Sequence, residues 1–321
     1  MNSRVTCVPA PTRATFSRVY VTDANGEPAS KFDRLLDPLR NGFAGVARVG
    51  SSNYRIDRGR LGLDGQPDAP WSLESAESRP WLDRVRARTV HTFEDVAEIR
   101  VGIKTTADNV FIRDDWDDEE LLCPLLTHHV ARKWKLDAPP NTHVLYPHTT
   151  DKSGKRTPVD LPRYPRAAAH LDSHRKQLAA RKYVAAAGRQ WFEIWVPQQP
   201  RDWPKLKIVW PDISESPAFF LDTSGAIVNG DCYWMTLRDG VDPRWLYMLL
   251  AVANSSFIER FYDTVFHNKL YAGRRRFMTQ YVRQFPLPGI DERIVALVQQ
   301  CIAGRTEGEP ELNSLVASAF S

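Results

Sequence analysis

Short apolar runs separated by proline and glycine constrain the fold of this chain most strongly between residues 192 and 237. Four of these runs have the length and composition of strands, at residues 192–196, 205–210, 219–221 and 226–237. Two apolar runs of helical length follow at residues 243–253 and 256–266, and Asn254 and Ser255 join them as a natural helix cap. Strands and helices do not alternate as βαβ units, so the sequence predicts a mixed α+β fold.

The remaining elements are predicted from local pattern. We expect strands at residues 15–22, 96–103, 110–112 and 144–146, with the second and third forming a hairpin. Acidic residues 117–120 favour a helix start just before the leucines that follow them. Residues 50–80 are rich in Ser, Gly, Pro and Asp and indicate an extended loop. Further helices are expected at residues 79–88, 164–187, 291–303 and 311–320.

Composition places the chain among globular proteins. Hydrophobic residues make up 42% and aromatic residues 11%, which is enough for a core and argues against disorder. No apolar run approaches the length of a membrane span, and the N-terminus lacks the apolar run of a signal peptide. The four cysteines lie far apart and form no C-x-x-C pair, so we expect reduced thiols in a cytosolic protein.

A cluster of cations at residues 260–283 is the main functional clue. It holds six Arg and Lys against Asp263, whereas the whole chain carries a net charge of only +4. Guanidinium forks suit phosphate oxygens, and interleaved aromatics can stack on bases. A solvated basic helix end is the alternative. The candidate nucleic-acid contacts in this cluster are His267, Lys269, Arg274, Arg275, Arg276 and Phe277.

A second basic segment covers residues 163–189, with seven Arg and Lys against Asp172. The rest of the chain is slightly acidic, so two basic segments indicate a footprint for a polyanion, although they could lie on opposite faces. The thin apolar stripe of the predicted helix at residues 164–187 leaves its basic residues on a surface. Its candidate contacts are His174, Arg175, Arg181 and Lys182.

The polar loop at residues 102–109 is the third candidate site. It offers a glycine, two hydroxyls, an amide and an ammonium within eight residues, which suits phosphates and base edges. It does not contain the Walker phosphate-binding pattern, and an ordinary hairpin turn is the alternative. The candidate contacts here are Lys104, Thr105, Thr106 and Asn109.

The sequence contains no standard metal-binding or catalytic motif. Cys123, His128 and His129 match no standard zinc spacing, so no metal site is expected. Glu193 followed by Lys205 and Lys207 faintly suggests a magnesium-dependent nuclease, but no third carboxylate has a convincing place. The sequence contains no esterase elbow, kinase set or dinucleotide fingerprint, and we assign no catalytic residue.

Taken in order, these segments resemble the C-terminal target-recognition region of TaqI-type and type IIG N6-adenine DNA methyltransferases. Residues 101–112 resemble the family's GI-x-TG-x-N-x-x-F segment, although Thr106 replaces its usual second glycine. Further matches follow at residues 122–133, 145–147, 164–181, 191–193, 207–214, 219–222, 231–233, 249–255 and 276–288. The resemblance spans roughly residues 91–290 and implies small, largely antiparallel sheets with flanking helices.

The resemblance also implies a function and its limits. It implies sequence-specific recognition of double-stranded DNA in a bacterial restriction-modification system, at the nucleoid in the cytoplasm. The family's S-adenosylmethionine loop and (N/D/S)PP(Y/F) tetrapeptide do not occur here, so the cofactor and methyl transfer are expected in a separate methyltransferase domain or subunit. Residues 1–90 would connect, 91–290 would recognise DNA, and 291–321 would add closing helices. A protein-interaction subunit of a phage-defence complex is the alternative, and a nuclease is a weaker one.

Overall fold

The computed structural model describes residues 15–22, 28–62, 72–75, 78–114, 120–136, 139–266, 270 and 273–321. The chain divides into two compact units, residues 1–87 and residues 88–321. The fold is mixed α+β with several small, mostly antiparallel sheets and flanking helices, which confirms the predicted class. None of the described helices is long and apolar enough to cross a membrane.

Unit 1 is built on a five-stranded sheet in which β4 pairs with β1, β3 and β5, and β3 pairs in parallel with β2. The short helix α1 (Leu36–Arg40) lies between β2 and β3 in the chain. The prediction of a loop over residues 50–80 is wrong for β4, because pairing with strands on both of its sides overrides its polar composition. The strands are β1 (Thr15–Val21), β2 (Ser30–Phe32), β3 (Gly45–Val49), β4 (Ser52–Gly62) and β5 (Ser72–Ser75).

Helix α2 (Arg79–Arg88) confirms the predicted helix and leads into unit 2. The main sheet of unit 2 has the order β10-β16-β14-β18-β7, and all its pairs are antiparallel except β10 with β16. All five residues of its central strand β14 are buried, so both faces of the sheet are covered. The strands are β7 (Ala97–Val101), β10 (Trp134–Lys135), β14 (Lys207–Pro211), β16 (Phe220–Asp222) and β18 (Cys232–Leu237).

A second sheet of unit 2 has the order β17-β9-β11-β8. Three two-stranded pairs complete the described strands: β12 with β13, β15 with β19, and β6 with β20. The second sheet consists of β8 (Ile112–Arg113), β9 (Leu122–Leu126), β11 (His143–Leu145) and β17 (Ile227–Val228). The pairs are β12 (His148–Thr150) and β13 (Arg156–Pro158), β15 (Ile213–Ser214) and β19 (Arg275–Arg276), and β6 (His91–Thr92) and β20 (Pro286–Leu287).

The chain crosses between the two sheets where the sequence predicted a hairpin. Strand β7 pairs with β18, whereas β8 pairs with β11 in the other sheet, and helix α4 (Asp108–Phe111) fills the crossing. Residues 192–196 form no strand and contribute only an isolated bridge from Val196 to Lys104. The short helix α3 (Phe93–Val96) replaces the start of the predicted strand at residues 96–103.

The helix predicted from the acidic run at residues 117–120 is also replaced, by strand β9. Residues 115–119 lie outside the described part of the chain, but Glu120 accepts hydrogen bonds from the backbone N–H groups of Arg166 (3.0 Å) and Ala167 (3.1 Å). Those groups belong to the first turn of α5 (Pro165–Ser173). The carboxylate therefore serves the N-terminus of a distant helix, where negative charge is favoured.

Residues 164–187 form three short helices, α5, α6 (Arg175–Ala179) and α7 (Lys182–Ala186), rather than the single helix that was predicted. The first break has a local cause. The hydroxyl of Ser173 donates to the carbonyl of His170 at 2.7 Å, and the ring of His174 contacts the same carbonyl at 3.0 Å. These side chains occupy the acceptor that a continuing helix would use.

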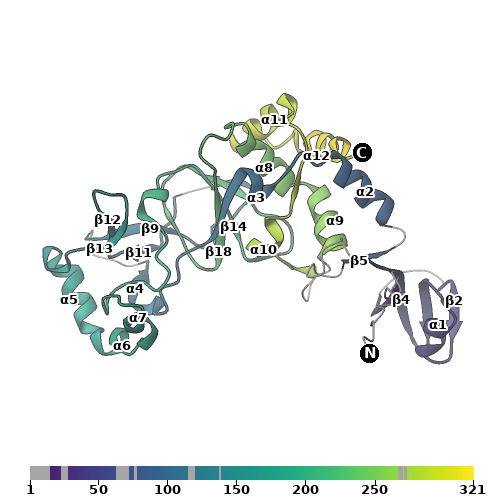
Figure 1. The fold of residues 1–321 in the computed structure, drawn as a ribbon, viewed down its shortest axis with the longest axis horizontal. Coiled ribbons are helices and arrows are strands. Elements are labelled where there is room, and N and C mark those ends of the chain that lie inside the picture. The colour runs from purple at the N-terminus through teal and green to yellow at the C-terminus, as the bar shows by residue number, and fades with distance from the viewer. Residues whose placement is uncertain are drawn as a thin grey trace, which may run out of the picture. The chain divides into compact units, whose positions relative to one another are not determined.

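The other end of unit 2 is helical (Figure 1), with the main sheet between it and α5–α7. Helix α8 (Trp245–Ala253) is apolar on all sides and almost entirely buried, as expected for a core helix. Ser255 caps α9 (Ser256–Val265), as predicted, by accepting from the N–H of Ile258. Helices α11 (Glu292–Ile302) and α12 (Glu309–Ala319) confirm the closing helices, and both pack on α8.

Candidate nucleic-acid interface

A cavity of about 580 Å³ opens between the two sheets of unit 2. Three segments that are distant in sequence line it: the predicted polar loop, the middle of α6, and the turn between β17 and β18. All of the polar-loop candidates, Lys104, Thr105, Thr106 and Asn109, belong to its lining. The other lining residues are Ile103, Ala107, Asp108, Gln177, Asn229, Gly230 and Asp231.

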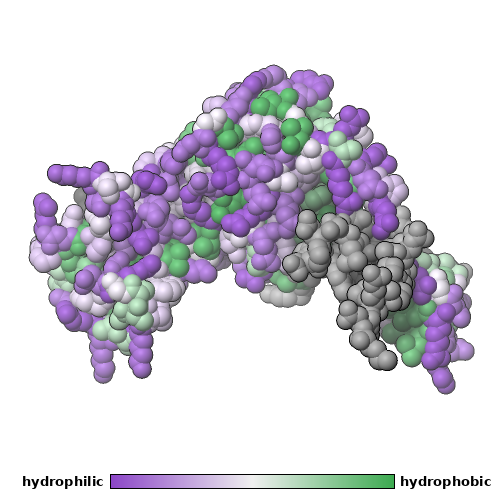
Figure 2. All heavy atoms as spheres, viewed as in Figure 1, coloured by the Kyte–Doolittle hydropathy of each residue, from purple (hydrophilic) through white to green (hydrophobic). Residues whose placement is uncertain are grey.

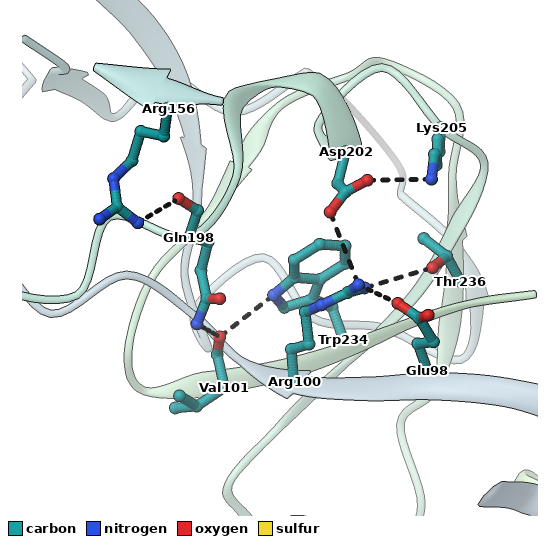
Figure 3. Close-up of polar contacts among 9 residues, drawn as sticks. All are labelled: Glu98, Arg100, Val101, Arg156, Gln198, Asp202, Lys205, Trp234 and Thr236. Atoms are coloured by element: carbon teal, nitrogen blue, oxygen red, sulfur yellow. Dashed lines mark hydrogen bonds and ion pairs between the residues drawn. The ribbon is translucent and has the colours of Figure 1, made fainter. Parts of the chain in front are cut away.

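The strand that enters the cavity is held by the contacts drawn in Figure 3. The carbonyl of Val101 accepts from Gln198 Nε2 at 2.7 Å and from Trp234 Nε1 at 3.1 Å. The guanidinium of Arg100 lies 5.1 Å from the centre of the Trp234 ring and also contacts Glu98 and Asp202. These contacts fix the backbone direction at the last residue before the loop.

Close backbone approach then holds the loop against the turn that follows β17. A Cβ atom on Gly102 would lie 1.9 Å from the carbonyl oxygen of Asn229, so only glycine fits there. The N–H of Ile103 donates to Val228 O at 2.7 Å, and Lys104 exchanges two 3.0 Å backbone hydrogen bonds with Val196. The side chain of Lys104 remains exposed. This arrangement presents its ammonium from a fixed backbone.

The two threonines of the loop have different roles. Thr105 is buried, and its hydroxyl accepts from the N–H of Ala107 at 3.1 Å and donates to Asp108. Thr106 is exposed and has a φ of 59°, in the left-handed region that favours glycine. This conformation is why glycine suits this position in the pattern that the loop resembles. Thr105 therefore braces the loop, whereas Thr106 presents its side chain to the cavity.

The second basic segment lies beside this loop. Arg181 is buried, and its guanidinium donates to the carbonyls of Leu178 (3.1 Å), Thr105 (2.9 Å) and Trp191 (2.7 Å). Burial lowers the pKa of Arg181 from its ordinary value. Because its donors are engaged with backbone carbonyls, the geometry favours a positioning role for Arg181, and its contact with DNA stays an untested prediction.

The other basic candidates of this segment remain on the surface. Arg175 is exposed, lies 4.5 Å from the centre of the Trp191 ring and pairs with Asp172 at 2.9 Å. Lys182 is exposed, whereas the ring of His174 is half-buried and contacts Ser173 and His170. On the face seen in Figure 2, hydrophilic residues cover most of the end of unit 2 that carries α5–α7.

The arginine cluster at residues 274–276 is largely engaged with carboxylates. Arg275 is buried and binds both oxygens of Asp263 at 2.8 and 2.9 Å, and these hydrogen bonds raise its pKa. Arg276 is half-exposed and makes a two-oxygen contact with Asp212 at 3.0 and 3.1 Å, which likewise raises its pKa. Arg275 therefore ties β19 to α9, which favours a structural role, and its contact with phosphate stays an untested prediction.

The neighbours of Arg275 differ in what they present. The ring of Phe277 is fully buried and its carbonyl accepts from Trp210 Nε1 at 2.8 Å, so it is a core residue and not a base-stacking one. The guanidinium of Arg274 lies 3.8 Å from the carboxylate of Glu215, and its side chain is 43% exposed. His267 and Lys269 lie outside the described residues.

The nuclease alternative gains no support from the geometry. Lys207 is fully buried and its ammonium lies 2.7 Å from the carboxylate of Asp222, which is itself buried. Glu193 accepts from the backbone N–H of Gln190 at 2.7 Å. Among the described residues, no three His, Cys, Asp or Glu side chains are close enough together to hold a metal ion.

Sequence reasoning missed Gln177 and the turn Asn229–Gly230–Asp231 as parts of the cavity. An Asn-Gly pair between two apolar runs signals a tight turn, and here it marks a crossing between sheets instead of a hairpin. Asp231 contacts the ring of His128, which ties the turn to the segment after β9. No local pattern distinguishes Gln177, because its position depends on the break between α5 and α6.

Comparison with known proteins defines the class. Residues 160–287 match the family described as the TaqI-like C-terminal specificity domain. This stretch of the chain therefore resembles a TaqI-like specificity domain, and the match includes Gln177 and the Asn229–Asp231 turn of the cavity.

Relatives of known class agree with this assignment. The chain is 34% identical over 328 residues to the type II methyltransferase M.BanIII of Aneurinibacillus aneurinilyticus, a match that covers 96% of this chain and 56% of that protein. It is 24% identical over 226 residues to the type II methyltransferase M.BstVI of Geobacillus stearothermophilus, covering 69% of this chain and 38% of that protein. The chain thus spans about half or less of the length of these relatives.

Two solved structures are also similar. The type IIL restriction-modification enzyme MmeI, solved in complex with DNA, has a TM-score of 0.48 at 10% identity, covering 73% of this chain and 33% of that one. The type IIG restriction endonuclease BpuSI has a TM-score of 0.44 at 10% identity, covering 77% of this chain and 32% of that one.

Proposed function

We propose that this chain recognises a specific sequence of double-stranded DNA for an adenine-N6 methyltransferase of a bacterial restriction-modification system, in the cytoplasm. The observation that carries the proposal is the specificity-domain match over residues 160–287, which includes part of the cavity lining. The loop at residues 102–109 lies outside that match and supplies all the other lining residues. The matched region and the loop thus meet at one cavity.

The contacts we propose follow from exposure and pairing. Lys104 and Arg274 would bind phosphates, because each presents an exposed cation from a backbone that its neighbours hold in place. Lys104 exchanges backbone hydrogen bonds with Val196, and Arg274 comes directly before β19, which pairs with β15. Arg276 would add a phosphate or a guanine edge after leaving Asp212. Arg175 and Lys182 would extend the footprint along α6 and α7. Thr106 and Asn109 would face base edges from the cavity wall.

Methyl transfer itself would be carried out by a separate S-adenosylmethionine-binding domain or subunit. Such enzymes act on a base that has been extruded from the duplex. This chain would then bind the DNA and determine the recognised sequence, whereas its partner would bind the cofactor and transfer the methyl group. This chain spans only 56% and 38% of the length of these two methyltransferase relatives, which supports a separate methyl-transfer domain or subunit.

Fluorescence anisotropy with labelled duplex DNA across a salt series tests the proposal. We expect affinity that falls steeply with salt, and a log–log slope that decreases by about one in Lys104→Ala and again in Arg274→Ala. Lys152→Ala, which changes an exposed lysine outside the cavity lining, is the matched control. Absence of salt-dependent affinity for duplex DNA would contradict the proposal. Binding to a defence protein that survives nuclease treatment, without DNA affinity, would favour the interaction-subunit alternative.

A further inference from the structure

Two amide side chains meet at the edge of the cavity. Asn109 lies in α4 and Gln177 lies in α6, and Gln177 Nε2 donates to Asn109 Oδ1 at 3.0 Å. Both side chains are exposed and both line the cavity. Within the described part of the chain neither amide group makes a further hydrogen bond, and both side chains are exposed, so their other donors and acceptors are open to a ligand.

Two further contacts fix the elements that carry this pair. Arg181, two residues beyond the end of α6, donates to Thr105 O just before α4, and His170 Nε2 in α5 contacts Val110 O within α4 at 2.9 Å. Both link the loop to the α5–α7 segment across more than fifty residues of sequence. Because α4 and α6 are connected in this way, the distance between the two amides is held by the fold and not only by their own hydrogen bond.

The paired amides present a defined hydrogen-bonding pattern. One N–H and one carbonyl oxygen are used within the pair, which leaves the other carbonyl oxygen as an acceptor and the other NH₂ as a donor. The pattern is the same whichever amide donates to its partner. Adenine offers the complement in the major groove, with its N6 amino group as donor and N7 as acceptor, whereas guanine offers two acceptors there.

The charges around the pair favour a neutral base edge over a phosphate. Asp108 and Asp231 both line the cavity, against the single ammonium of Lys104. Two carboxylates would repel a phosphate, but they do not oppose an uncharged base. Apart from Lys104, the exposed cations that suit phosphates in this region include Arg175 and Lys182, which lie on α6 and α7 outside the cavity lining.

We infer that Asn109 and Gln177 together read one adenine in the major groove of the recognised duplex. The inference rests on the proposed function and deepens it by naming the base and the two side chains that select it. Asn109 Nδ2 donates to adenine N7, and Gln177 Oε1 accepts from the N6 amino group. If the two amides exchange roles, so that Gln177 Nε2 donates to adenine N7 and Asn109 Oδ1 accepts from the N6 amino group, the pair reads the same base.

Base analogues test this inference on the full chain. The preferred duplex is selected from a randomised pool, and each adenine in it is then replaced in turn by 7-deazaadenine, which lacks N7, or by purine, which lacks the amino group. We expect one position at which each analogue weakens binding roughly 5- to 100-fold. At that position, Asn109→Ala should abolish the penalty of one analogue and Gln177→Ala that of the other.

The controls separate this inference from the function it rests on. Gln300→Ala changes an exposed glutamine on α11 and should retain both penalties in full. Thermal melting of each variant checks that the fold is kept. Duplex affinity with sequence preference, but with no adenine whose analogue penalty depends on Asn109 or Gln177, overturns the inference and leaves the proposed function standing. Absence of duplex affinity overturns both, and coupling to a thymine instead of an adenine overturns the inference alone.

Discussion

The guanidinium of Arg181 donates to the carbonyl of Thr105, which lies 76 residues earlier in the chain, at 2.9 Å. The same group reaches Trp191 O at 2.7 Å, so one side chain connects the polar loop, the helical segment and the chain that follows it. A buried cation with its donors on backbone carbonyls positions all three segments, and it does so without requiring an acidic partner.

Arg181→Ala should therefore destabilise unit 2 and loosen the polar loop. Three backbone carbonyls lose a charged donor, so we expect the free energy of unfolding to fall by about 3 kcal/mol. Urea denaturation followed by circular dichroism measures this loss. Arg175→Ala removes an exposed arginine from the neighbouring helix and should change the free energy by less than about 1 kcal/mol. Equal effects of the two substitutions would contradict the positioning role.

Substitution of Arg275 should reduce the stability of the fold, whereas substitution of Arg274 should reduce DNA binding. Arg275→Ala leaves Asp263 without its two-oxygen partner, and we expect a loss of about 3 kcal/mol of unfolding free energy. Arg274→Ala should leave stability within about 0.5 kcal/mol, because its side chain is 43% exposed. Thermal melting and DNA titration of both variants measure the two effects. A stable Arg275→Ala protein with weakened DNA binding would reverse our assignment.

Gly102→Ala should be far more disruptive than an ordinary glycine substitution. The added methyl group would meet the Asn229 carbonyl at 1.9 Å, so the contact between loop and turn must open. We expect a loss of roughly 2–3 kcal/mol, by overpacking. Gly289→Ala is the control, since its added methyl group would have no heavy atom within 4 Å. Similar melting temperatures for the two variants would show that the close approach does not hold the cavity together.

His148 should make the protein acid-sensitive. Burial lowers its pKa to about 3, with Arg156 and Arg189 adding to the effect, and its Nε2 accepts from the N–H of Ile194. The unfolded chain takes up this proton near pH 6.5, so stability is present above pH 6.5 and is lost as the pH falls from there towards 3. At pH 5 the loss should be about 2 kcal/mol.

Urea unfolding at pH 7.5 and pH 5 measures this dependence. His148→Gln keeps an acceptor for Ile194 and has no proton to gain, so the difference between the two pH values should shrink by about 2 kcal/mol. The comparison is made between the wild-type and variant differences, because carboxylates elsewhere contribute equally to both. An unchanged difference in the variant would contradict the lowered pKa of His148 in the folded protein.

The sequence predicted the helical half of unit 2 well, because its signals are local. The apolar runs that became α8 and α9, the cap at Ser255, and the two closing helices are all decided within a few turns of chain. The fold class followed from the same short-range patterns. The polar loop was also singled out from the sequence, and all four of its named residues line the cavity, whereas their contact with DNA stays a prediction.

The errors arose where distant partners decide the structure. Glu120 caps α5 instead of starting its own helix, and β7 pairs with β18 instead of folding back on the segment beside it. Gln177 reaches the cavity only because α5 ends at Ser173. The basic run at residues 274–276 looked uniform in sequence, yet Asp263 and Asp212 engage two of its three arginines. Charge counting cannot detect such pairing.

The chain passes between the two sheets of unit 2 twice, once between β7 and β8 and once between β17 and β18. The polar loop and the Asn229–Asp231 turn are joined mainly through backbone atoms, so the frame does not depend on which polar side chains they carry. On the proposed function, a residue such as Asn109 can be exchanged while both sheets keep their pairing. A domain built in this way can acquire a new DNA target through a few substitutions where the polar loop meets this turn, and engineering of its specificity should begin there.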